Sequence, residues 1–207
     1  MKVALSLDDF SVLNNRLDLL LKIKEHYPNF KVSLFTIPFD VQYEVSTQAR
    51  IYREAALAKI KENLDWMQII PHGLTHMTDE FKRCDYKLFK DKVIPSIKEA
   101  FDKDGLPFEK GFKAPYWLWN KDVVRALDDE GWWGAVDRNQ PDMLKTKKFY
   151  EYSHSLDEPY YKSNLDTLKL HGHIGSLDND LEKCFLNIFK LPSDVIWIYV
   201  TDYIETK

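Results

Sequence analysis

The chain has 207 residues, 44% of them hydrophobic and 14% aromatic, which is enough to bury one substantial core. Its formal net charge is -4, so the composition excludes proteins that bind nucleic acid through a strongly basic surface. Two cysteines, Cys84 and Cys184, are too few for a disulfide-stapled fold. We interpret both as reduced thiols and expect one cytoplasmic domain spanning residues 1–207.

The apolar stretches are short. Val3–Leu7, near the start of the chain, is shorter than the apolar region of a signal peptide. The longest late apolar run, Val195–Val200, falls far below the roughly 20 residues that span a bilayer. We therefore expect no export signal and no membrane partner.

In the first half of the chain, compact apolar runs alternate with segments of helical periodicity. Apolar residues at three- and four-residue spacing predict helices, and runs rich in β-branched and aromatic residues predict strands. Pro28 closes one helix, Pro38 closes one strand, and Pro95 is expected to kink the third helix. The predicted strands are 3–7, 31–37 and 66–71, and the predicted helices are 11–27, 48–64 and 86–101.

The second half of the chain continues the alternation less regularly. Asn120 is a predicted N-cap, and Gly131 is expected to end the helix that Asn120 begins. Residues 138–166 are polar and irregular around a single apolar run, which predicts a long loop. The predicted strands are 111–114, 132–136, 149–155, 167–170 and 195–200, and the predicted helices are 121–130 and 177–189.

Alternating strands and helices indicate parallel βαβ units. About seven strands in a chain of this length predict an α/β fold, a distorted (β/α) barrel. An open, doubly wound sheet is the alternative architecture.

Polar residues follow the ends of several predicted strands. In a parallel barrel the carboxyl ends of all strands meet on one face, so residues far apart in sequence converge there. We therefore expect one site that draws on several strands. Its candidate residues are Asp8, Asp9, His72, His76, Lys113, Asp137, His171 and His173.

The stretch His72-Gly-Leu-Thr-His76 carries the most chemical information. One turn of helix would point both imidazoles the same way and allow them to share a divalent metal. With Asp9 they give one carboxylate and two imidazoles, the ligand number of a catalytic zinc site with room for water. The zincin pattern H-E-x-x-H has its general base where this chain has Gly73, so the base must come from elsewhere. Asp8-Asp9 is the natural source.

Four motifs in order resemble the polysaccharide deacetylase family, also known as the NodB homology domain or carbohydrate esterase family 4. They are Ser6-Leu-Asp-Asp9, His72-Gly-Leu-Thr-His76, Lys113-Ala-Pro-Tyr116 and Leu168-Lys-Leu-His171. The resemblance covers residues 3–173, and the first two motifs are the specific ones. It implies metal-dependent removal of an N-acetyl or other acyl group from a carbohydrate or amino sugar.

The resemblance also implies a role for each matching residue. Asp8 would be the general base and His171 the general acid, while the Tyr116 backbone N–H would help to hold the oxyanion. One divalent metal, zinc by preference for mixed nitrogen and oxygen donors, would be the cofactor. Its implied ligands are Asp9, His72 and His76.

Three positions depart from the family pattern. Lys113 stands where the family has Arg, and a lysine lacks the planar fork that holds two groups at once. Asp137 and Asp142 compete for the role of a supporting carboxylate, and we name Asp142 as the candidate. His173 follows His171 so closely that the general acid remains a choice between them, with His171 preferred.

Tryptophans near the third motif suggest a substrate groove. Trp117 and Trp119 either line it or pack in the core, whereas Trp132 and Trp133 are expected in the core. The expected partner is a small-molecule or oligosaccharide substrate. Two other functions remain open: hydrolysis of a small non-sugar amide or formyl group, and carbohydrate binding without turnover.

Overall fold

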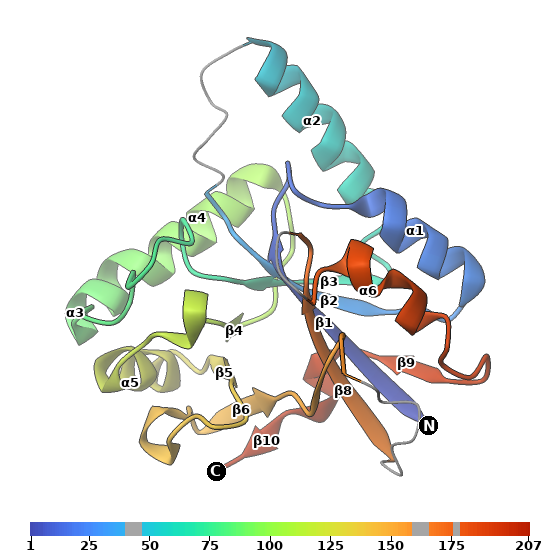
Figure 1. Ribbon diagram of the computed structural model, residues 1–207. Helices are drawn as coiled ribbons and strands as arrows, with labels where there is room; N and C mark the ends of the chain where they lie inside the picture. The colour runs from blue at the N-terminus through green and yellow to red at the C-terminus, as the bar shows by residue number, and fades with distance from the viewer. Residues whose placement is uncertain (40–46, 159–165, 176–178) are drawn as a thin grey trace.

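The computed structural model describes residues 1–39, 47–158, 166–175 and 179–207. Within these residues the strands form two mostly parallel sheets (Figure 1). The six-stranded sheet has the order β3-β2-β1-β8-β7, with β9 also paired to β1, and the four-stranded sheet has the order β10-β6-β5-β4. A bridge between His72, after β3, and Lys113, after β4, links one pair of sheet edges. The predicted distorted α/β barrel is confirmed.

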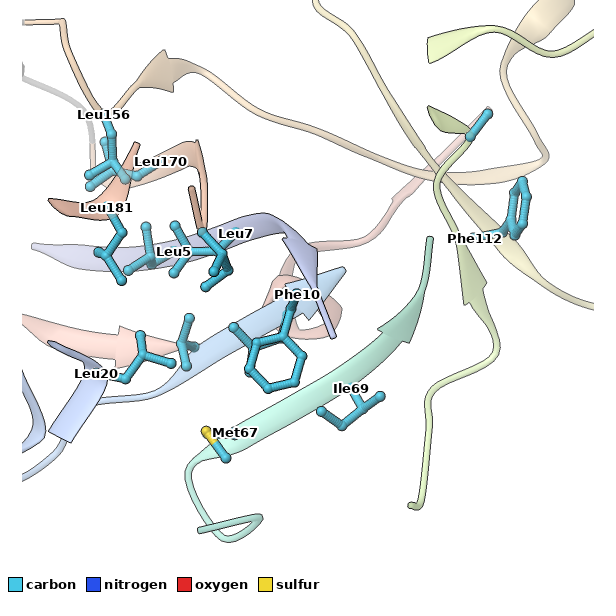
Figure 2. Close-up of a cluster of buried hydrophobic side chains, with 14 of the residues drawn as sticks. Leu5, Leu7, Phe10, Leu20, Met67, Ile69, Phe112, Leu156, Leu170 and Leu181 are labelled. Carbon is cyan, nitrogen blue, oxygen red and sulfur yellow. The ribbon is translucent and has the colours of Figure 1, made fainter. Parts of the chain in front are cut away.

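The central strand β1, Lys2–Phe10, is buried on both of its faces. Side chains alternate between the two faces of a strand. Val3, Leu5 and Leu7 pack in the large core between the sheets and the helices. Figure 2 shows Leu5 and Leu7 among the apolar side chains of this core. Ala4, Ser6 and Asp8 therefore face the barrel interior.

A second, smaller apolar cluster fills the interior of the barrel. The aromatic ring of Phe35 lies 6.4 Å from that of Trp133 and 6.3 Å from that of His72. Phe35 thus separates the packed interior from the polar groups at the carboxyl ends of the strands. The buried members of the cluster are Phe35, Ile70, Trp133, Ala135, Tyr150 and Val200.

The helices follow the prediction with shifted ends. Asn120 caps α5 as predicted, because its side-chain oxygen accepts hydrogen bonds from the Asp122 and Val123 N–H groups. A π-helical segment, Phe89–Val93, precedes Pro95 where a kink was expected. The helices are α1 (Leu17–His26), α2 (Thr47–Lys61), α3 (Tyr86–Leu88), α4 (Ile94–Asp104), α5 (Lys121–Asp129) and α6 (Leu181–Ile188). None of these helices, in the part of the chain that is described, combines the length and the apolar character that a membrane span needs.

The strands differ from the prediction in several respects: the strand expected at 195–200 covers only Ile196–Ile198, and a short strand at Glu205–Thr206 was not predicted. The single strand expected at 149–155 is in fact two, β6 (Lys148–Glu151) and β7 (His154–Ser155), which lie in different sheets. Strand β8 does not end at residue 170, because its pairing with β1 continues to the Asp8–His173 pair. The remaining strands are β2 (Val32–Thr36), β3 (Met67–Pro71), β4 (Gly111–Phe112), β5 (Trp133–Val136), β8 (Thr167–His173), β9 (Ile196–Ile198) and β10 (Glu205–Thr206).

Candidate active site

The expected convergence of polar residues at the carboxyl ends of the strands is present. Asp8 lies near the end of β1 and His173 ends β8, while His72 directly follows β3. Lys113 directly follows β4. Contacts between side chains of these separate strands form one continuous polar cluster.

Asp8 and Asp9 reach this cluster together because β1 is irregular there. Leu7 pairs with Leu34 and Phe10 with Thr36, so β1 has one residue more than β2 over this stretch, as in a β-bulge. Asp9 occupies the extra position with a left-handed φ of 61°. A carboxylate oxygen of each aspartate lies within 4 Å of His72 Nε2: 3.8 Å for Asp8 and 3.4 Å for Asp9.

Asp9, His72 and His76 form a compact donor set. Asp9 Oδ1 lies 2.9 Å from His76 Nε2 and 3.4 Å from His72 Nε2. This oxygen is buried but makes no hydrogen bond of acceptable geometry within the described residues. The three donor atoms lie within 4.8 Å of one another. One carboxylate and two imidazoles directed at a shared space fit a divalent metal such as zinc.

The ring orientation of His72 is fixed by the backbone. Its Nδ1 lies 3.1 Å from the Lys113 carbonyl oxygen, which can only accept a hydrogen bond. The proton is therefore assigned to Nδ1, and the lone pair of Nε2 points toward Asp9. Burial acts to raise the pKa of Asp9, but the interactions with His72 and His76 outweigh it and hold that pKa well below its usual range.

His76 reaches the site from a loop and not from a helical turn, which corrects the expectation from spacing. Gly73 and His76 both have left-handed φ values, 67° and 61°. A Cβ on Gly73 would lie 2.7 Å from Pro115 Cγ and 2.7 Å from a Glu80 carboxylate oxygen, so no glutamate base can stand there. The Glu80 carboxylate braces the loop by accepting hydrogen bonds from the Thr75 N–H and hydroxyl.

Asp8 and Lys113 form a buried ion pair. Lys113 Nζ contacts Asp8 Oδ2, and the lysine side chain is 1% exposed. The ammonium also lies 3.5 Å from the centre of the Trp117 ring. Burial alone would raise the pKa of Asp8, but Lys113 and the nearby histidines hold it at about 2. Burial lowers the pKa of Lys113 to about 8, so both groups are charged at neutral pH.

His171 and His173 face the same carboxylate from neighbouring positions on one side of β8. The Nε2 atom of each lies 3.8 Å from Asp8 Oδ2. Burial, followed by the charge of Lys113, lowers the pKa of His171 well below its usual value. The expectation that His171 is the first residue past the strand is wrong, because both histidines belong to β8.

The turn at Pro115–Trp117 covers one side of the cluster. Tyr116 is 53% exposed, and its ring centre lies 5.1 Å from that of His76. Trp117 packs between Lys113 and the 171 imidazole, so its ring supports charged groups. Trp119 is buried and stacks on Phe112, which places it in the core with the two later tryptophans.

The structure separates the two candidate supporting carboxylates. The Asp142 side chain is 87% exposed and lies 3.8 Å from Lys145, so it does not join the cluster. Asp137 directly follows β5 and accepts a hydrogen bond of 3.3 Å from the Tyr152 hydroxyl. The ring of Tyr152 lies 4.8 Å from that of His171. The motifs do not indicate Tyr152, although it directly follows β6 and lies two residues after the buried Tyr150.

Asn179 is the second residue that the sequence did not indicate. Its Oδ1 lies 2.7 Å from His173 Nδ1, and its Nδ2 donates a hydrogen bond of 3.0 Å to Ser155 Oγ. Asn179 lies between β8 and α6, and no periodicity or motif marks a residue in such a position. Asn179 and His173 meet only because the fold brings them together.

Comparison with known proteins gives a result at the level of the fold. No protein-family model and no curated protein sequence matches the chain significantly. Solved structures match over most of its length. A family 4 carbohydrate esterase pseudoenzyme from Bacillus anthracis is 14% identical, with a TM-score of 0.58 and coverage of 95% of this chain and 63% of that chain. This chain is therefore shorter than the Bacillus anthracis protein.

Two enzymes have the same fold. A peptidoglycan N-acetylglucosamine deacetylase is 14% identical, with a TM-score of 0.61 and coverage of 100% of this chain and 89% of that chain. A family 4 acetyl xylan esterase from Clostridium thermocellum, solved with a cobalt ion, is 12% identical. Its TM-score is 0.58, and the match covers 98% of this chain and 89% of that chain. The structural resemblance to carbohydrate esterase family 4 that the motifs predict is confirmed.

Proposed function

We propose that the chain belongs to carbohydrate esterase family 4 and is a metal-dependent hydrolase that removes an N-acetyl or similar acyl group from an amino sugar. One observation carries the proposal. The donor set Asp9, His72 and His76 lies beside a second, separate carboxylate, Asp8, at the carboxyl ends of the barrel strands. A metal site with an adjacent ionised base suits hydrolysis of an unactivated amide.

The proposed cofactor is one divalent metal ion, with zinc favoured by the mixed nitrogen and oxygen donors. When bound, it would supply Lewis acidity toward the acyl oxygen and the water. Asp9, His72 and His76 would hold it. The cobalt ion in the acetyl xylan esterase structure supports a transition metal in a protein of this fold.

The remaining residues move the protons and stabilise the oxyanion. Asp8, which is ionised at neutral pH, accepts a proton from the attacking water. Lys113 and His72 fix the position of its carboxylate. A histidine of β8 delivers a proton to the leaving nitrogen. The Tyr116 backbone N–H stabilises the oxyanion that develops on the acyl group.

The proposed substrate is a small or oligomeric amino sugar. The exposed ring of Tyr116, next to His76, offers an apolar surface on which a sugar ring can lie. The deacetylase of the same fold, which acts on peptidoglycan N-acetylglucosamine, supports this substrate class.

Carbohydrate binding without turnover is the second candidate. The contact of Lys113 with Asp8 favours it, because this contact occupies an oxygen of the proposed base. The presence of both Asp8 and a complete donor set favours an enzyme, since loss of the base is the simplest route to a binding protein.

Acetate release separates these functions. Purified protein, reconstituted with zinc or cobalt, would be incubated with chitooligosaccharides, N-acetylated nucleotide sugars and simple N-acetyl amides. We expect release from the sugars, a loss of about 10²–10⁴-fold in Asp8→Asn with metal retained, and loss of metal in His76→Ala. Sugar binding without release in the wild type would support the second candidate. Release from the simple amides alone would overturn the proposed substrate class.

A further inference from the structure

The two histidines of β8 are equally distant from Asp8 but lie in different surroundings. The side chain of His171 is 5% exposed and that of His173 is 17% exposed. A donor of protons to a substrate must reach the reacting nitrogen. The more accessible imidazole is therefore the better placed of the two.

His171 is enclosed by groups that oppose a positive charge on it. Its Nε2 lies 3.4 Å from Lys113 Nζ, and the ammonium has protons to donate, so this nitrogen is engaged as an acceptor. The rings of Trp117 and Tyr152 pack against the imidazole at 5.5 and 4.8 Å. A buried imidazolium beside an ammonium is unfavourable, so His171 is suited to holding Lys113 in place.

His173 instead has a partner that fixes the proton on the far side of its ring. Asn179 Nδ2 donates to Ser155 Oγ, which orients the amide and leaves Oδ1 for His173 Nδ1 at 2.7 Å. An amide oxygen only accepts, so Nδ1 carries the hydrogen. The His173 backbone N–H also donates to the Asn179 carbonyl oxygen at 3.2 Å. These bonds leave Nε2 directed at Asp8.

Gly172 makes this approach of Asn179 possible. A Cβ at this position would lie 2.8 Å from the Asn179 carbonyl oxygen and 2.5 Å from Leu156 Cδ1. Only a residue without a side chain lets the backbone at Asn179 approach β8 so closely. The glycine between the two histidines therefore serves the contact of the second histidine with its partner.

We infer that Asn179 is a positioning residue that sets the tautomer and direction of His173, and that His173, not His171, donates the proton to the leaving nitrogen. The inference rests on the proposed deacylation for the identity of the reaction. In that step His173 Nε2–H gives its proton to the nitrogen as the carbon–nitrogen bond breaks, and Nδ1–H remains bonded to Asn179. The ring returns to neutrality, and the amine leaves uncharged.

Nitrogen-15 spectra of the histidine rings test the positioning independently of catalysis. We expect His173, assigned with His173→Gln, to be the Nδ1–H tautomer when neutral. Asn179→Leu should lose this signature and Asn179→Asp should retain it. Asn187→Leu, which removes a neighbouring asparagine bonded to the Leu156 carbonyl, should leave it unchanged. A neutral His173 with its proton on Nε2 in the wild type would overturn the role of Asn179, whether or not the variants fold.

The choice of proton donor is tested with two leaving groups. On an N-acetyl sugar, His173→Ala should lose about 10²–10⁴-fold in rate and Asn179→Leu about 10–100-fold. On 4-nitrophenyl acetate, whose leaving group needs no proton, both losses should be at least about 10-fold smaller. If His171→Ala shows this difference and His173→Ala does not, the inference is wrong. If the wild type releases acetate from no sugar, the proposed function fails, while the ring spectra still decide the role of Asn179.

Discussion

Replacing Lys113 with methionine removes the buried cation beside Asp8 while keeping a side chain of similar length. Lys113 is 1% exposed and contacts Asp8 Oδ2 directly, and Asp8 Oδ1 has no hydrogen-bond partner among the described residues. Removal of one member of a buried ion pair destabilises a protein by about 3–5 kcal/mol. For a chain of this size each kcal/mol corresponds to roughly 2–4 °C in Tm, so we expect a loss of about 6–20 °C.

Thermal unfolding in chelator measures this loss, with Lys113→Arg as a control that keeps the charge. The loss should depend on pH. In the wild type the pKa of Asp8 lies at about 2, below its usual 3.8, so its stabilising effect is present above pH 3.8 and disappears as the pH falls through 2. In the variant, burial raises the pKa of Asp8, so the penalty is relieved as the pH falls. The two proteins should therefore converge in Tm on acidification.

Added metal gives a second readout of the same variant. Donor atoms of Asp8, His171 and His173 lie within 4.8 Å of one another, and Lys113 supplies the positive charge among them. Without that charge, a second divalent ion can bind, so the variant should take up two equivalents where the wild type takes up one. At a free concentration of 100 times its Kd, this ion would restore about 2.7 kcal/mol of stability to the variant. A Tm in chelator within about 2 °C of the wild type would refute the reasoning that Lys113 compensates Asp8.

Three further predictions concern single residues. Gly73→Ala should lower Tm more than Gly131→Ala. Both glycines have a left-handed φ, but only a Cβ at Gly73 would meet other atoms, with Pro115 Cγ at 2.7 Å. Equal losses of stability in the two variants, each of about 1–2 kcal/mol, would mean that the structure shifts to relieve the contact with Pro115. Cys84 should react with a thiol reagent at least about 100-fold more slowly in the native than in the unfolded protein, since burial raises its pKa to about 11; rapid labelling would contradict the burial. Asp142→Ala should leave metal content and acetate release unchanged, because this carboxylate lies outside the cluster.

The meeting of polar residues at the strand ends was the most predictable feature of the candidate site. Strand periodicity placed Asp8 and His72 at the ends of β1 and β3, and the geometry of parallel barrels requires those ends to meet. This inference depends only on local spacing and on general rules for α/β folds.

The supporting contacts were not predictable, because they depend on backbone conformation and on distant loops. His76 enters the site through a left-handed loop braced by Glu80, whereas its spacing from His72 suggested a helix. Asn179 returns to His173 from the segment before α6. The choice between Asp137 and Asp142 depended on the path of the chain after β5, which composition does not encode.

Backbone strain in this structure collects where function is proposed. Among the described residues, six non-glycine residues have a left-handed φ, and four of them lie in the cluster or on its rim: Asp9, His76, Tyr116 and Trp117, with φ between 55° and 61°. The other two are Arg16 and Asp79. Such conformations cost about 1–3 kcal/mol each and persist only where the surroundings enforce them.

The strain at Asp9 has a specific consequence for chemistry. In a regular strand, neighbouring side chains point to opposite faces, so only one of two successive aspartates could reach the barrel interior. The extra residue in β1 and the left-handed φ of Asp9 turn the second carboxylate back toward His72. Asp9 then lies alongside the two imidazoles while Asp8 remains with Lys113. A single local distortion thus separates the proposed metal ligand from the proposed base in adjacent residues, and a regular β1 could present one of these groups but not both.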